Sequence, residues 1–190
     1  MYSAIEAREL TLGPLQATAK SKSAPVFVNG APLRAMLATP QAPLRIPFEW
    51  GNFDQSDSAR VQLCLEIPDD LRAWVESLES LAALAVADRS QELFKRKVSP
   101  EDARRTMCSA LRTTDGTLLK LKVNRAGPNV VRVWTPEGAE AAVPAVTRNS
   151  FCAPVVELKS LWVNASQWGL LWQISDAIFV QPPKAFPWGA

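Results

Sequence analysis

Histidine is absent from all 190 residues of the sequence. This absence excludes Ser-His and Cys-His nucleophile pairs, histidine general bases and histidine metal ligands. The eight glycines are scattered and form no phosphate-binding loop, and the G-x-S-x-G motif is missing as well. Asp69 and Asp70 could suggest a metal or acid pair, but acidic residues at the start of a helix explain them. We therefore expect no catalysis and no cofactor, and an enzyme that uses carboxylates and a bound metal is the weakest alternative.

Cysteines and long apolar runs are also scarce. Cys64, Cys108 and Cys152 are isolated in the sequence, which favours three reduced thiols in a reducing compartment and gives no spacing for a zinc site. No apolar run approaches the roughly 18 residues that span a bilayer, and the start MYSAIEAREL is too acidic for a signal peptide. We expect a soluble intracellular protein of the cytoplasm or nucleus, with no membrane partner.

Charge is unevenly distributed although the formal net charge is only +2. Residues 49–88 carry a net charge of −7, whereas residues 95–132 carry +7. A local basic block of this kind can create the field that a polyanion site needs. The alternative is a solvated basic face whose partner is the acidic block of the same chain.

Hydrophobic periodicity predicts a mainly β chain with helices in its middle. Apolar residues alternate over 60–67 and 117–123, as in half-buried strands, and helical spacing begins after Pro68, with Glu76 and Glu79 on the polar side. A second helix should begin at Ser99, with an apolar stripe that continues to residue 111. Further strands are expected over 25–30 and 33–37, joined by an Asn-Gly turn, and over 45–50, 130–134, 154–163 and 169–180.

This order of elements argues for an antiparallel OB-type barrel with two helices inserted midway, because the helices do not alternate with strands as they would in a parallel sheet. The expected organisation is a mobile arm or weak strand over 1–23, an OB-like nucleic-acid-binding domain over 24–180 and a proline-rich tail over 181–190.

Basic residues and tryptophans are interleaved in the second half of the chain. If residues 126–129 form a tight turn, Lys122 faces Arg132 and Lys120 faces Trp134 on the outward side of one hairpin. Like charges opposite each other weaken a sheet, so this arrangement calls for an anion. Phosphate attraction together with base stacking is typical of single-stranded nucleic-acid sites. The alternative for Trp134 is that it ends a strand and folds into the core.

The last hairpin gives a second set of expectations. A turn centred near residue 166 pairs 162 with 170, which places Trp162 and Trp172 on the apolar face. Trp168 is then expected at the exposed end of the hairpin, where it either binds a ligand or packs on the tail. Lys95, Arg96 and Lys97 are the next candidates for a polyanion site.

Three stretches resemble the single-stranded-DNA-binding OB-fold proteins of large DNA viruses and phages. They are the segment 43–54 (PLRIPFEWGNFD), the lysine-x-lysine strand 119–123 that follows the helix region 93–111, and the late pattern of 155–174 with Trp162, Gly169 and Trp172. The resemblance covers about residues 25–180 and implies an OB barrel and single-stranded DNA as the ligand. Many such proteins end in an acidic tail that recruits replication proteins, whereas residues 181–190 contain Lys184 and no acidic residue.

The resulting hypothesis is a non-catalytic single-stranded-DNA-binding protein that acts in replication, recombination or repair. Single-stranded DNA, with RNA as the alternative, is the expected ligand, and a homodimer and replication proteins are further candidate partners. The alternative hypothesis is a structural or assembly protein, such as a virion component with a β-sandwich.

Overall fold

A computed structural model describes residues 7–17, 21–52, 59–113, 116–145 and 147–180. The proline-rich tail 181–190 lies outside this range, as do residues 1–6 and 18–20 of the segment 1–23 that the sequence suggested as a mobile arm or weak strand. The helices are α1 (Asp69–Asp88), α2 (Ser90–Phe94) and α3 (Pro100–Arg105). The strands are β1 (Leu10–Leu12), β2 (Gln16–Ala17), β3 (Lys22–Val28), β4 (Leu33–Met36), β5 (Leu44–Ile46), β6 (Gly51–Asn52), β7 (Arg60–Glu66), β8 (Leu111–Thr113), β9 (Thr117–Asn124), β10 (Arg132–Trp134), β11 (Glu140–Ala141), β12 (Ser150–Val163) and β13 (Trp168–Val180).

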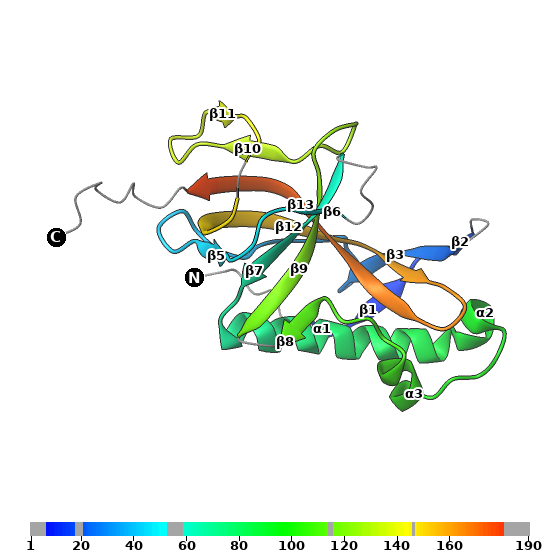
Figure 1. Cartoon of the computed structure of the whole chain (residues 1–190). Coiled ribbons are helices and arrows are strands. Elements are labelled where there is room, and N and C mark those ends of the chain that lie inside the picture. The colour runs from blue at the N-terminus through cyan, green and yellow to red at the C-terminus, as the bar shows by residue number, and fades with distance from the viewer. Residues whose placement is uncertain (1–6, 18–20, 53–58, 114–115, 146, 181–190) are drawn as a thin grey trace.

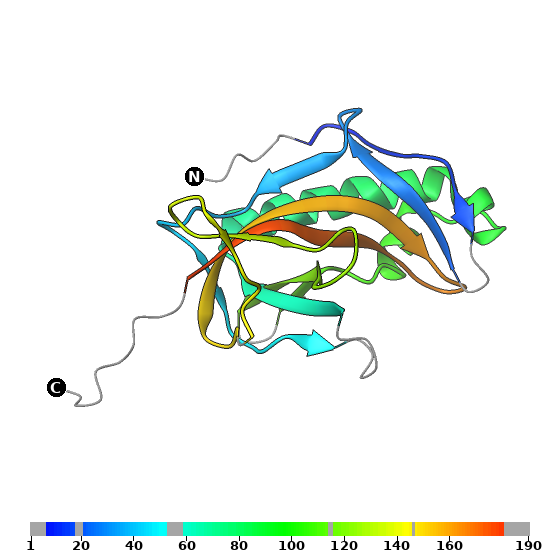
Figure 2. The same cartoon turned by 90° about the horizontal axis from the view of Figure 1, so that it is seen from above.

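The strands form one curled sheet in the order β1-β3-β12-β13-β9-β7-β6 (Figures 1 and 2). Its centre is the long hairpin β12–β13, and the other edge of β12 pairs successively with β3, β4 and β5. Between β13 and β9 the described residues pair at one position, Gln173 with Lys122. The chain after α3 bridges the remaining gap: the Cys108 N–H donates to the Trp168 carbonyl at 2.7 Å, and the Lys120 N–H donates to the Ala110 carbonyl at 2.9 Å.

Helix α1 covers the inner face of the sheet (Figure 1). Its buried side includes Leu71, Trp74 and Leu78, and the rings of Trp74 and Trp172 lie 5.8 Å apart. These contacts join the helix to the core that lines the inner face of β7, β9, β12 and β13. The expected mainly β fold with helices inserted midway is confirmed, and the short α2 is an additional helical turn.

Glu79 is buried, which corrects its expected place on the polar side of α1. Its carboxylate accepts hydrogen bonds from the Ser109 hydroxyl and, at 2.8 Å, from the Ala110 N–H. Burial raises the pKa of Glu79 despite these hydrogen bonds. Through these hydrogen bonds Glu79 connects α1 to the segment around Ser109 and Ala110 that bridges β9 and β13.

Helix α3 begins as expected but ends early. The Ser99 side chain accepts a hydrogen bond from the Asp102 N–H, which confirms Ser99 as the N-cap. The helix stops at Arg105 although the apolar stripe continues to residue 111. The reason is tertiary: Met107 bridges to Trp168 of β13, so the chain beyond the helix is extended.

Two expected hairpins keep their turns but lose their strand pairing. Asn29 and Gly30 have φ values of +50° and +79° and close a turn at Val28 and Ala31. The two flanking strands β3 and β4 then separate, and both pair with β12.

The expected pairing of residues 117–123 with 130–134 is wrong in the same way. The Val131 N–H donates to the Asn124 carbonyl at 2.8 Å, next to the turn. Strand β10 then leaves β9 and runs parallel to β13, with Arg132 beside Asp176. Strand β9 pairs instead with β7, so Lys122 lies opposite Gln62 and Lys120 lies opposite Cys64.

No helix among the described residues is long and apolar enough to cross a membrane.

Candidate nucleic-acid interface

A row of polar residues crosses the outer face of the sheet, opposite α1. Paired positions place Arg34 of β4, Glu157 of β12, Gln173 of β13, Lys122 of β9 and Gln62 of β7 side by side. The side chains of paired residues point to the same side of a sheet. The neighbouring row is buried on the inner face and consists of Leu33, Leu158, Trp172, Leu121 and Leu63. The polar row therefore defines the outer face.

Lys120 and Lys122 share the outer face of β9, because the alternate residues Leu119, Leu121 and Val123 are buried. The expected outward position of these two lysines is confirmed. They line a cleft of about 180 Å³ over the junction of β9, β13 and the bridging segment. The other residues of this cleft are Gln62, Cys108, Ser109, Ala110, Leu121, Trp162, Leu170, Leu171 and Trp172.

Trp162 is half-buried and belongs to this cleft, which corrects its expected place in the core. It pairs with Gly169 across the β12–β13 hairpin. A Cβ atom on Gly169 would lie 2.8 Å from Cζ2 of Trp162 and 2.9 Å from the Cys108 carbonyl oxygen. Glycine is thus the residue that lets the indole of Trp162 and the bridging segment both approach β13.

Trp168 has the opposite environment from the one expected. It is 0% exposed, and its indole N–H donates to the Ala103 carbonyl at 2.7 Å. The expectation of an exposed, ligand-binding Trp168 is wrong, and this side chain fixes the hairpin to α3. The expected burial of Trp172 is confirmed.

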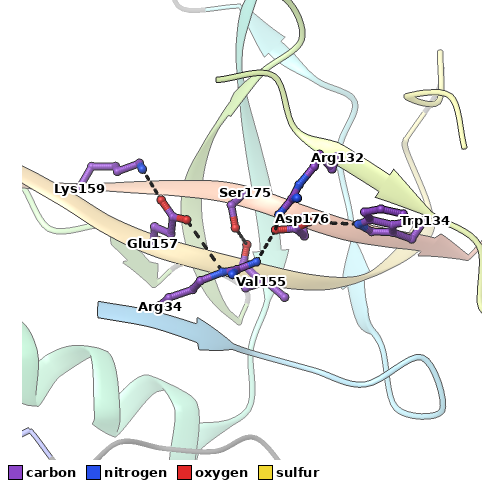
Figure 3. Close-up of polar contacts among 8 residues, drawn as sticks. All are labelled: Arg34, Arg132, Trp134, Val155, Glu157, Lys159, Ser175 and Asp176. Carbon is purple, nitrogen blue, oxygen red and sulfur yellow. Dashed lines mark hydrogen bonds and ion pairs between the residues drawn. The ribbon is translucent and has the colours of Figure 1, made fainter. Parts of the chain in front are cut away.

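Arg132 and Trp134 lie further along the same face, where Asp176 binds both (Figure 3). Asp176 accepts hydrogen bonds from the Arg132 guanidinium at 3.0 Å and from the Trp134 indole N–H at 3.1 Å. Arg34 of the polar row also donates to Asp176, at 2.6 Å, which ties this cluster to the outer face. The guanidinium carbon of Arg132 lies 5.9 Å from the centroid of the Trp134 ring, within cation–π range.

Electrostatics hold this cluster in place. Burial alone would raise the pKa of Asp176, but the hydrogen bonds from Trp134 and Arg132 outweigh it and the pKa is lowered. The side chain of Asp176 is only 10% exposed, whereas those of Arg34 and Arg132 are more than half exposed. The buried carboxylate therefore orients two arginines and one half-buried tryptophan that solvent can reach. Glu157 pairs in addition with Arg34 and Lys159 (Figure 3).

The structure thus gathers the four residues that the sequence assigned to one hairpin, although by a different route. Lys122 lies beside Gln173 and Arg132 lies beside Asp176, three residues further along β13. At a rise of about 3.3 Å per residue, the two groups lie about 10 Å apart along the strand. Lys95, Arg96 and Lys97 are exposed in the connection between α2 and α3 and do not line the cleft.

Trp162 lies at the surface and Trp168 in the core, the reverse of the expected arrangement, and the sequence holds one signal of this. Trp168, Leu170, Trp172 and Ile174 occupy alternate positions of β13, so one face contains them all. The β-bulge between Leu158 and Ser160, which turns Trp162 outward, has no clear mark in the sequence.

No family model and no curated protein match this sequence. Solved structures match it over nearly the whole chain. The single-stranded DNA-binding protein from bacteriophage Enc34 in complex with single-stranded DNA has a TM-score of 0.51 at 10% identity, over 92% of this chain and 98% of the phage chain. The single-stranded DNA-binding protein gp2.5 encoded by bacteriophage T7 has a TM-score of 0.51 at 16% identity, over 84% and 91%.

These similarities concern the fold. They confirm the expected OB-type fold with inserted helices and, at the level of architecture, the resemblance to phage single-stranded DNA-binding proteins.

Proposed function

We propose that the outer face of the sheet binds single-stranded DNA, without catalysis, in replication, recombination or repair. The observation that carries this proposal is the cleft in which the half-buried Trp162 lies with Lys120 and Lys122. Arg132 and Trp134 extend the same face. The similarity in fold to two phage single-stranded DNA-binding proteins, one of them solved with its DNA, supports this choice of ligand.

The chemistry of the face suits a flexible strand. Unpaired bases can stack on an exposed indole while their phosphates lie near ammonium or guanidinium groups, and stacking contributes about 1–3 kcal/mol per base. Stacking on an indole and attraction of phosphates do not depend on the identity of the base, so we expect little sequence preference. Paired bases in a duplex cannot expose their flat sides to Trp162, and duplex DNA should therefore bind more weakly.

The direct test is fluorescence anisotropy of a labelled oligothymidylate over a range of salt concentrations. Trp162→Ala should weaken binding by about 1–3 kcal/mol, because one stacked base is lost. The double variant Lys120→Gln/Lys122→Gln should make the slope of log K against log salt shallower by about 1.4, since each phosphate contact on a single strand contributes about 0.7.

Arg72→Gln is the matched control. Arg72 lies on α1, at the opposite side of the sheet, and pairs with Asp69 at 3.3 Å, so its loss should leave the slope unchanged. The control removes one charge and the lysine variant removes two, so an effect of the control half as large as that of the lysine variant would show that only net charge matters. Absence of oligonucleotide binding together with concentration-dependent oligomers would favour the assembly protein, and preferential competition by an RNA strand would change the assigned ligand.

A further inference from the structure

A second basic hollow lies outside the outer face, between the α2–α3 connection and the turn of the β12–β13 hairpin. It has a volume of about 310 Å³. Arg96, Lys97 and Arg105 supply three cations to its lining, and Asp102 supplies one carboxylate. The remaining lining residues are Phe94, Val98, Thr106 and Ser166. A hollow with this excess of positive charge and one aromatic wall suits an anion attached to a flat or apolar group.

The loop that carries Arg96 and Lys97 has a defined shape. Lys95 adopts a left-handed conformation with φ of +62°, and its N–H donates to the Gln91 carbonyl at 3.1 Å. The Val98 N–H donates to the hydroxyl of the buried Ser90 at 3.1 Å, which fixes the other end of the loop. The two neighbouring cations are therefore carried by an ordered turn, so little backbone freedom is lost when an anion binds.

The cations of this hollow differ in how strongly they are already neutralised. Arg105 forms ion pairs with Glu101 and Asp102, each at 3.4 Å. Within the described part of the chain, Arg96 and Lys97 have no carboxylate within 4.0 Å. These two residues consequently have the charge to offer to an external anion.

The hollow and the Trp162 cleft are separate cavities, but the bridging segment and the β12–β13 hairpin supply residues to both. Thr106 lines the hollow and Cys108, two residues later, lines the cleft. The hairpin supplies Ser166 to the hollow and Trp162 to the cleft. Two residues of extended chain span about 7 Å, so a ligand that leaves one site can reach the other.

We propose that the hollow between α2, α3 and the hairpin turn is a second subsite for the sugar-phosphate backbone of the same single strand. The strand would lie from the Trp162 cleft past the hairpin turn to Arg96 and Lys97, with Phe94 as an apolar wall for a sugar or base. This inference rests on the proposed function and extends the binding path around one end of the molecule.

The test compares oligothymidylates of increasing length on the full chain, with the double variant Arg96→Gln/Lys97→Gln. The shortest oligonucleotide that binds the wild type should bind this variant with unchanged affinity. Longer oligonucleotides should bind it at least 10-fold more weakly, with a salt slope shallower by about 1.4 for two lost phosphate contacts. The matched control is Arg104→Gln, because Arg104 is exposed on α3 and does not line the hollow.

The outcomes separate this inference from the proposed function. Equal affinities of wild type and double variant at every length would overturn the second subsite, while the Trp162→Ala effect would keep the cleft. A loss that is the same at every length, or that Arg104→Gln reproduces at half its size for its one removed charge, would also overturn it, because a general charge effect would explain the result. Circular dichroism and melting temperature should be unchanged in all of these surface variants, which keeps the comparison valid.

Discussion

Replacing Trp168 with alanine tests the hairpin register on which the candidate site depends. Trp168 is fully buried and its indole N–H donates to the Ala103 carbonyl at 2.7 Å, so the substitution opens a large cavity and cuts a link to α3. Truncation of a buried tryptophan costs about 3–5 kcal/mol. For a domain of this size each kcal/mol lowers the melting temperature by about 2–4 °C, so we expect a fall of roughly 6–20 °C. Trp162→Ala should cost less than about 2 kcal/mol, because its ring is only half-buried.

Urea unfolding followed by far-ultraviolet circular dichroism measures both variants, since removal of a tryptophan alters the fluorescence signal itself. Trp168→Phe is the matched control: it keeps most of the packing and loses the hydrogen bond, at a cost of about 1 kcal/mol. The Thr106 hydroxyl lies 3.2 Å from the Ala103 carbonyl and 3.0 Å from the Asp102 carbonyl, so its single proton is shared between the two acceptors. If Trp162→Ala proves more destabilising than Trp168→Ala, the hairpin has the register expected from the sequence, and the cleft argued from Trp162 is refuted.

Three further predictions concern the surroundings of the cleft and the face. Gly169→Ala should cost about 1–3 kcal/mol and weaken oligonucleotide binding, because its Cβ would lie 2.8 Å from Trp162; a variant with wild-type stability and affinity would contradict the close approach. The lowered pKa of Asp176 adds stability above the pKa of the unfolded carboxyl, near 3.8, and this stability is lost as the pH falls. In Asp176→Asn the free energy of unfolding in urea should no longer contain this contribution when it is measured between pH 7 and 3. A pH profile identical to that of the wild type would count against the cluster of Asp176 with Arg132. For Glu79 the dependence of stability on pH runs in the opposite direction, because burial raises its pKa in the folded protein. The free energy of unfolding should therefore fall as the pH rises through the folded pKa of Glu79, and Glu79→Gln should flatten that part of the profile. A profile as steep as that of the wild type would show that Glu79 is not buried.

Local patterns in the sequence predicted the elements whose geometry depends on near neighbours. The alternation in β7 and β9 predicted their buried residues, and Ser99 predicted the start of α3, because both depend on residues a few positions away. The partner of β10 could not be predicted in this way. Its turn with β9 is local and was expected, but pairing with β13 depends on contacts more than 40 residues away in sequence, which no alternation pattern records.

The same limit decided which tryptophan lines the cleft on the outer face. Asn164 accepts hydrogen bonds from the N–H groups of Ser166 and Gln167, at 3.0 and 2.8 Å, and this loop closes the hairpin with Val163 opposite Trp168. The expected pairing of 162 with 170 differs from this register by one residue. Because side chains alternate with a period of two, a shift of one residue moves a side chain to the other face of the sheet. Asparagine bonding to its own following backbone is a recognisable turn signal, so the closing pair could have been argued from the sequence. The bulge after Leu158 could not, and it is the bulge that turns Trp162 away from the core and toward Lys120 and Lys122.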